Sequence, residues 1–153
     1  MFSKQEAAQL RKEFWTVFGQ YMSPIPSSEG EKINWINYRT GVKGLQFKMD
    51  VNSNGASIAI ELILTDAEKQ KFFFEQLIQQ KNIFQNILQE EWTWRLHTYG
   101  ENGKMVSKVY KEKKGGNILK REDWPSLISF FKLRIMKLDE FWNSVKYGFE
   151  GWQ

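Results

Sequence analysis

An Asn-Gly turn lies between two stretches of alternating residues in the segment LQFKMDVNSNGASIAIELIL, residues 45–64. From Leu45 to Val51 the odd positions are apolar and the even positions are polar. Successive side chains of a strand point to opposite faces, so this period of two predicts a strand with one buried face. The Asn-Gly pair tolerates the positive φ angles of a tight turn, and NSNG (52–55) therefore predicts a β-hairpin.

Three more segments have the composition and alternation of strands. They are INWINYR (33–39), WTWRLHTY (92–99) and MVSKVYKE (105–112), the last two joined by a second Asn-Gly turn, ENGK (101–104). Aromatic and β-branched residues dominate the first of them, and such residues favour a pleated, half-buried surface. The sequence therefore predicts five strands.

Three helices are predicted where apolar residues recur at steps of three and four. The first ends before Pro24, and the second runs to about residue 88. Their starts are marked by Ser3 with Glu6, by Thr65 with Glu68, and by Asp123 with Pro125. The order α-β-β-β-α-β-β-α predicts a single α+β domain over residues 1–153, with a mostly antiparallel five-stranded sheet and helices packed on one face.

Cysteine is absent, and no apolar run approaches the roughly 18 residues that suggest a membrane span. The absence of cysteine excludes disulfides, cysteine-bound zinc and thiol catalysis, and it fits a reducing compartment. The start of the chain also lacks the apolar region of a secretion signal. We therefore expect a cytoplasmic protein that does not enter a membrane.

Aromatic residues make up 16% of the chain, so their burial is expected to dominate folding. Trp35 and Trp152 are the tryptophans expected outside the core, because one follows the Pro- and Ser-rich loop of residues 23–32 and the other lies in the tail. The loop itself is interpreted as a connection, with a binding surface as the alternative.

Charged residues are expected on the face of the sheet that does not meet the helices. Lys48, Asp50 and Glu61 share that face if the apolar sides of their strands are buried, and Arg95 and His97 join them if strand 92–99 follows the same alternation. One interpretation is a set of solvated charges that pair across the strands. The other is a site in which Asp50 and Glu61 bind Mg²⁺.

The catalytic alternative is a divergent or degenerate nuclease of the PD-(D/E)XK type. Those enzymes have the order helix, three strands, helix, strand, and their acidic residues on neighbouring strands hold Mg²⁺. Asp50 and Glu61 are the candidate ligands and catalytic residues. The lysine expected two residues after the second acid is replaced by Ile63, so only Lys48 remains as a candidate to assist the attacking water. This departure counts against catalysis.

The sequence lacks the motifs of other common catalytic sites. His97 is the only histidine, and a zinc site cannot be built from one histidine without cysteine. Neither a G-x-S-x-G nucleophile elbow nor a glycine-rich phosphate loop occurs. We therefore expect no cofactor, apart from Mg²⁺ in the nuclease alternative.

Residues 104–121 carry an excess of six positive charges, because Glu112 is the only acid among seven cations. Such a segment is a candidate surface for nucleic acid or an acidic partner, although lysines also protect the edges of sheets. The candidate nucleic-acid-binding residues are Lys104, Lys108, Lys111, Lys113, Lys114, Lys120 and Arg121.

Several blocks of the sequence are distinctive in combination. They are the segment from FWTVFGQYM to INYRTGVKG, then FFFEQL, EEWTW, YKE and EDWPSLISFFKLRI with LDEFW. Together they resemble the bacterial family named domain of unknown function 4268, over about residues 2–150. The resemblance implies a short, stand-alone form of a module that follows a nuclease-type domain in some longer relatives, and so a genome-defence or nucleic-acid setting. The family brings no established catalytic residues.

We interpret the chain as a non-catalytic binding or interaction module with nucleic acid or a protein as its partner. The alternatives are the metal-dependent nuclease and a homodimeric scaffold for protein interactions. The sequence favours a protein that is not an enzyme.

Overall fold

The computed structural model describes residues 2–100 and 102–149. Its elements are α1 (Lys4–Met22), β1 (Leu45–Asn52), β2 (Gly55–Leu62), α2 (Ala67–Gln79), α3 (Lys81–Leu88), β3 (Thr93–Tyr99), β4 (Met105–Lys114), the 3-10 turn η1 (Arg121–Asp123), α4 (Trp124–Val145) and the 3-10 turn η2 (Lys146–Gly148). In this part of the chain the sheet has four strands in the order β1-β2-β4-β3, and each neighbouring pair is antiparallel. The fold is α+β, but the prediction of five strands is wrong.

The segment predicted as the first strand, residues 33–39, is an irregular loop. The side-chain oxygen of Asn34 accepts hydrogen bonds from the backbone N–H groups of Ile36 and Asn37, and this local turn competes with strand pairing. Trp35 is only 3% exposed and donates its indole N–H to the Ile25 carbonyl. The aromatic composition of the loop therefore reflects burial, and Trp35 belongs to the core. Trp152 lies outside the described residues.

The helix predicted from residue 65 to residue 88 is two helices, α2 and α3, which meet at Gln80. Asp66 caps α2, because its carboxylate accepts hydrogen bonds from the N–H groups of Glu68 and Lys69. The break lets α3 turn so that Phe84 packs against Trp92 and Trp94 at ring distances of 5.3 and 5.5 Å. The buried side chains of α2 and α3 therefore face two different directions, whereas the sequence predicted one continuous apolar stripe on a single helix.

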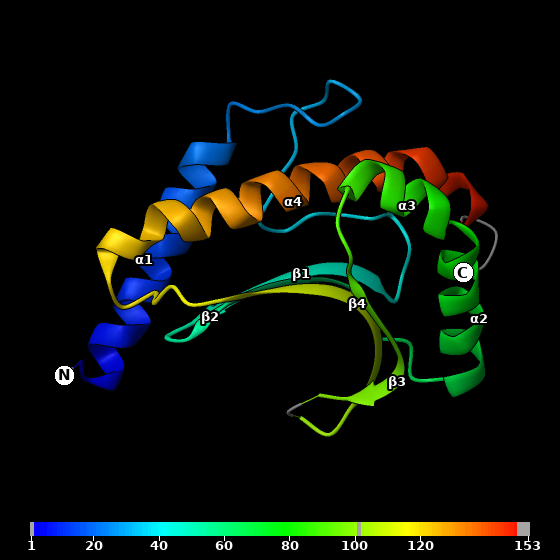
Figure 1. Ribbon diagram of the computed structural model, residues 1–153, viewed down its shortest axis with the longest axis horizontal. Coiled ribbons are helices and arrows are strands. Elements are labelled where there is room, and N and C mark those ends of the chain that lie inside the picture. The colour runs from blue at the N-terminus through cyan, green and yellow to red at the C-terminus, as the bar shows by residue number, and fades with distance from the viewer. Residues whose placement is uncertain (1, 101, 150–153) are drawn as a thin grey trace.

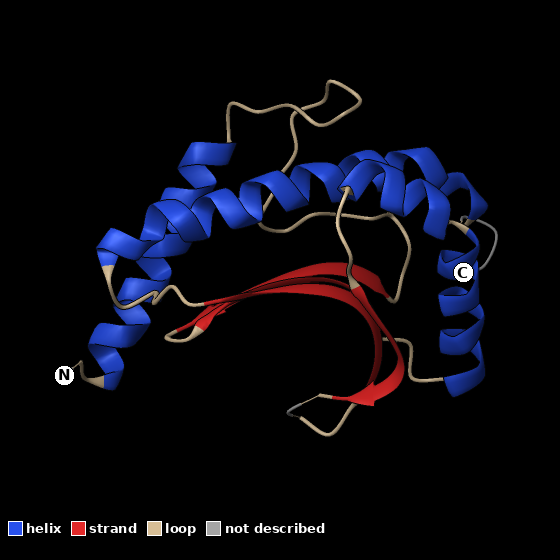
Figure 2. Cartoon of the chain, in the orientation of Figure 1, coloured by secondary structure: helices blue, strands red, loops and turns tan. Residues whose placement is uncertain are grey.

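The helices cover the convex face of the curved sheet and leave its concave face open (Figure 1 and Figure 2). Ile58, Ile60 and Leu62 of β2 are fully buried beneath α4, which contributes Phe131 and Trp142 to the same core. This burial is the main source of stability, at about 25 cal/mol for each Å² of apolar surface. None of the helices in residues 2–100 and 102–149 is both long and apolar enough to cross a membrane.

Candidate functional site

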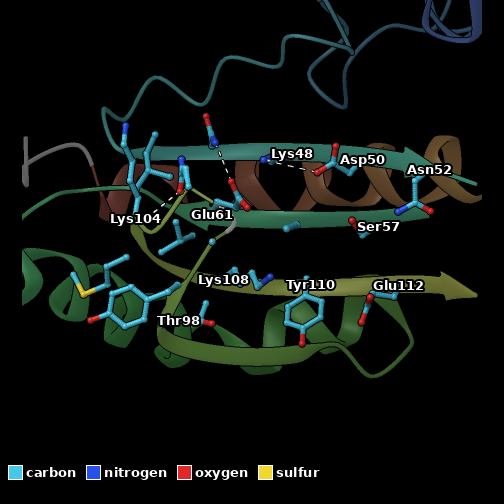
Figure 3. A pocket seen from close by; sticks show the side chains of 18 of the residues that line it. Lys48, Asp50, Asn52, Ser57, Glu61, Thr98, Lys104, Lys108, Tyr110 and Glu112 are labelled. Carbon is cyan, nitrogen blue, oxygen red and sulfur yellow. Dashed lines mark hydrogen bonds and ion pairs between the residues drawn. The ribbon is translucent and has the colours of Figure 1, made fainter. Parts of the chain in front are cut away.

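A groove of about 1010 Å³ lies on the concave face of the sheet (Figure 3). Side chains that point away from the helices line it, together with Arg11 of α1 and with Tyr99 and Lys104 beside the turn between β3 and β4. The polar residues that β1, β2 and β4 contribute are Gln46, Lys48, Asp50, Asn52, Ser57, Glu61, Lys108, Tyr110 and Glu112.

The strand register arranges these side chains in rows across the sheet. In one row Lys48, Ala59 and Tyr110 lie side by side on β1, β2 and β4. The small side chain of Ala59 leaves space between a cation and an aromatic ring. The ammonium nitrogen of Lys108 lies 4.6 Å from the centroid of the Tyr110 ring, which is a cation–π contact. The middle of the groove therefore combines positive charge with an aromatic surface.

Asp50 and Glu61 face the same groove but do not lie together. Asp50 is opposite Ser57, which precedes Glu61 by four residues on β2. At about 3.3 Å per residue the two carboxylates are separated by about 13 Å along the strands, which is too far for both to bind one Mg²⁺.

Each of these acids has another partner. An oxygen of Asp50 lies 3.8 Å from the ammonium of Lys48, and Glu61 accepts a 2.9 Å hydrogen bond from the amide of Gln46. Within the described ranges no group of three or more His, Cys, Asp or Glu side chains is placed to hold a metal ion. Asp50 is therefore in an ion pair within β1, and Glu61 is hydrogen-bonded to a neutral amide across the two strands.

Strand alternation divides the lysines of β4 between the two faces of the sheet. Lys108 lines the groove, and Lys114 shares its face because the two lie an even number of positions apart along the strand. Lys111 and Lys113 point to the opposite face, where the ammonium of Lys111 donates a 2.9 Å hydrogen bond to the Glu91 carbonyl.

The other three cations of the predicted basic segment lie outside β4. Lys104 lines the groove, and Lys120 is exposed ahead of η1. Arg121 pairs with Glu13 of α1 and lies 4.8 Å from the ring of Trp124. The hydrogen bond from Arg121 lowers the pKa of the Glu13 carboxyl. The seven predicted cations therefore do not form one surface.

Arg95 and His97 lie on different faces because β3 contains a bulge between them. From Arg95 to Thr98 the register shifts, so that β3 has one residue more than β4. Arg95 stays opposite Lys108 on the groove side. His97 has a φ of 49°, and its ring nitrogen Nε2 lies 3.0 Å from the carbonyl oxygen of Ala67 in α2. The inserted residue turns the side chain of His97 to the opposite face of the sheet. The prediction assumed a regular alternation without a bulge and therefore placed His97 on the wrong face.

The groove residues that the sequence did not predict include Arg11, Tyr99 and Tyr110. Tyr110 lies two residues after Lys108 on the same strand, so strand alternation contained the signal. Tyr99 is 73% exposed, an unusual position for a large ring. No pattern in the sequence marks Arg11 as a groove residue, because only tertiary packing brings α1 to the groove.

The loop of residues 23–32 is held on the helix side of the molecule. Asp139 of α4 is 1% exposed and accepts hydrogen bonds from the hydroxyl of Tyr38 (2.5 Å), the N–H of Ser28 (2.7 Å) and the amide of Asn143 (3.1 Å). Burial, and next the hydrogen bond to Asp139, raises the pKa of Tyr38 well above its ordinary value. These bonds anchor the loop to the core.

The fold and the groove define an α+β protein whose antiparallel sheet has one helix-covered face and one open polar face. The chain belongs to the family described as domain of unknown function (DUF4268), which matches residues 10–146. The match confirms the resemblance in the sequence and spans all four strands. Searches for similar curated proteins and for similar solved structures found no match.

Proposed function

We propose that this chain is a non-catalytic binding module that takes a single-stranded nucleic acid on the concave face of its sheet. The observation that carries the proposal is the combination of aromatic rings and cations in the groove, Tyr99 and Tyr110 with Lys104 and Lys108. Proteins bind single strands by stacking bases on aromatic side chains while cations follow the phosphates. A duplex hides the faces of its bases, so the exposed ring of Tyr99 favours a single strand.

The charge of the concave face also favours a polyanion. Among the residues that the structure describes, three carboxylates are outnumbered by six cations that line the groove or share its face by register: Asp50, Glu61 and Glu112 against Arg11, Lys48, Arg95, Lys104, Lys108 and Lys114. These nine residues therefore give this face an excess of three positive charges. Asp50 and Glu61 already have partners in Lys48 and Gln46, which lessens their repulsion of phosphates.

Fluorescence anisotropy tests this proposal with labelled oligo-dT, oligo-U and a duplex of equal length, each titrated at several salt concentrations. Single strands should bind more tightly than the duplex, and their affinity should fall with salt because binding releases counterions. Lys108→Ala should weaken binding and reduce the slope of log K against log salt by about 0.7, the share of one phosphate contact. Tyr99→Ala should cost about 1–3 kcal/mol at an unchanged slope, because stacking releases no counterions.

Lys113→Ala is the matched control, since it removes the same charge from the same strand on the opposite face. It should bind as the wild-type chain does. Equal losses in Lys108→Ala and Lys113→Ala would show that only the overall charge matters, and would contradict binding in the groove. No measurable binding to any of the three probes would contradict nucleic acid as the ligand.

A further inference from the structure

β1 forms an edge of the sheet that no other strand covers within the described residues. The N–H of Ile63 donates to the carbonyl of Gly44, which fixes the phase of the hydrogen bonds between β1 and β2. Because antiparallel hydrogen bonds alternate, the even-numbered residues of β1 bond to β2. The backbone N–H and C=O groups of Phe47, Met49 and Val51 therefore point outward, away from the sheet.

The backbone N–H and C=O of Leu45 also point outward, but both already have hydrogen-bond partners. The unpaired edge of β1 therefore begins after Leu45. The N–H of Leu45 donates to the Val42 carbonyl at 3.2 Å, and its own carbonyl accepts a 2.7 Å hydrogen bond from the Thr40 hydroxyl. After Leu45, β1 continues to Asn52 in an unbroken register without proline. Proline, bulges and short length protect many edge strands, and none of them occurs in this stretch, whose one lysine is Lys48.

The opposite edge of the sheet differs. β3 contains the bulge between Arg95 and Thr98, and His97 within it has a left-handed backbone. A bulge interrupts the regular series of outward groups and hinders pairing with another strand. Of the two edges, only β1 presents a regular template for a further strand.

We propose that β1 pairs with β1 of a second copy of this chain, antiparallel and centred on Met49. In this register Lys48 lies opposite Asp50 of the second copy, and Asp50 lies opposite its Lys48. These are non-hydrogen-bonded positions, where facing side chains are closest. Both side chains are accessible in the single chain, at 51% and 68% exposure. On the helix side Phe47 lies opposite Val51, so the strand is complementary to itself in charge and in hydrophobicity.

Charge also disfavours the neighbouring registers. Centring the pair on Lys48 places two lysines directly opposite each other, and centring it on Asp50 does the same with two aspartates. Like charges in facing positions destabilise a strand pair. Centring on Phe47 or Val51 leaves both charges opposite uncharged residues. The sequence of β1 therefore favours one register.

The dimer has a continuous sheet of twice the four strands. Its two-fold axis is perpendicular to the sheet, so the two concave faces lie on the same side. The pairing uses backbone groups and the Lys48–Asp50 pairs, and it is independent of what the grooves bind.

Sedimentation equilibrium of the full chain tests the proposal. The wild-type chain should have twice the monomer mass of 18.2 kDa. Lys48→Asp and Asp50→Lys each place like charges opposite each other, and each variant should sediment as a monomer. The two variants are complementary to one another, so mixing them in equal amounts should restore the dimer mass. The double variant Lys48→Asp/Asp50→Lys should dimerise without a partner variant.

Recovery on mixing distinguishes lost complementarity from lost folding, which mixing cannot repair. Met49→Pro is a second, independent test, because it removes an outward N–H that β2 does not use. This variant should be a monomer with the far-UV circular dichroism of the wild-type chain. A wild-type monomer at the highest concentration reached, or a dimer whose mass none of these substitutions changes, would overturn the proposal.

Discussion

Asp139 shows how one buried polar side chain fixes segments that are distant in the sequence. Two of its donors, Tyr38 and Ser28, precede it by 101 and 111 residues. The loss of one partner of a buried polar group lowers the stability of the fold by about 1–3 kcal/mol. These bonds therefore strongly favour one path for the chain between α1 and β1.

Replacing Tyr38 tests this contact through its pH dependence. Tyr38→Phe should lower the free energy of unfolding by about 1–3 kcal/mol at neutral pH, because Asp139 loses a donor. The pKa of Tyr38 is raised in the folded chain, so near pH 10 the unfolded chain loses this proton first. The stability from Tyr38 is therefore complete below about pH 10 and is lost as the pH rises, by up to about 1.4 kcal/mol per pH unit.

Urea unfolding of both proteins between neutral pH and pH 11 measures this effect. The stabilities of the wild-type chain and of Tyr38→Phe should converge above about pH 10. A difference that stays constant across this range would show that the Tyr38 hydroxyl is not held in its protonated form by the fold.

Among the elements, the β1–β2 hairpin depends on Gly55. A Cβ atom at this position would overlap the backbone carbonyl oxygen of Lys113. Lys113 belongs to β4, which pairs with β2 in the sheet. Gly55→Ala should therefore cost about 3 kcal/mol or more, because β2 and β4 must separate locally. Gly30 is the matched control, since it has a φ of +80° but open space around it.

Thermal and urea unfolding of the two glycine variants should differ for this reason. Gly30→Ala carries only the cost of a left-handed backbone, about 1–2 kcal/mol. Equal losses in both variants would mean that the backbone conformation, and not the close approach of β4, explains the glycine at position 55.

For the molecule as a whole, the groove and the β1 edge meet on one surface. In the proposed dimer two grooves face the same side, so a strand that crosses both gains a second contact at high effective concentration. The wild-type chain should therefore bind an oligonucleotide that spans both grooves more tightly than one that fills a single groove. Met49→Pro should bind both lengths with the affinity of the wild-type chain for the short one.

Anisotropy titrations with the two oligonucleotide lengths measure this difference. If the wild-type chain is a dimer but binds both lengths equally, one strand does not cross both grooves. If Met49→Pro keeps the preference for the longer strand, the preference does not come from pairing at β1.

Local features of this fold can be read from the amino-acid sequence alone. The NSNG turn joins β1 and β2, and alternation correctly places the polar residues of β1 on one face. The helix start predicted at Ser3 is also confirmed, because the Ser3 hydroxyl accepts a 3.1 Å hydrogen bond from the N–H of Glu6 as an N-cap. These features depend on residues a few positions apart, and turn geometry and side-chain direction are properties of so short a stretch.

The other features of the fold depend on packing between residues that are distant in the sequence. The segment 33–39 has strand-like residues, yet Trp35 is buried with its indole N–H donated to the Ile25 carbonyl, and the segment forms a loop instead of a fifth strand. A one-residue bulge sends His97 to the helix side, and register places Asp50 and Glu61 on one face but far apart. Strand parity was visible in the sequence, whereas burial, bulges and the offset between strands depend on contacts with residues distant in the chain.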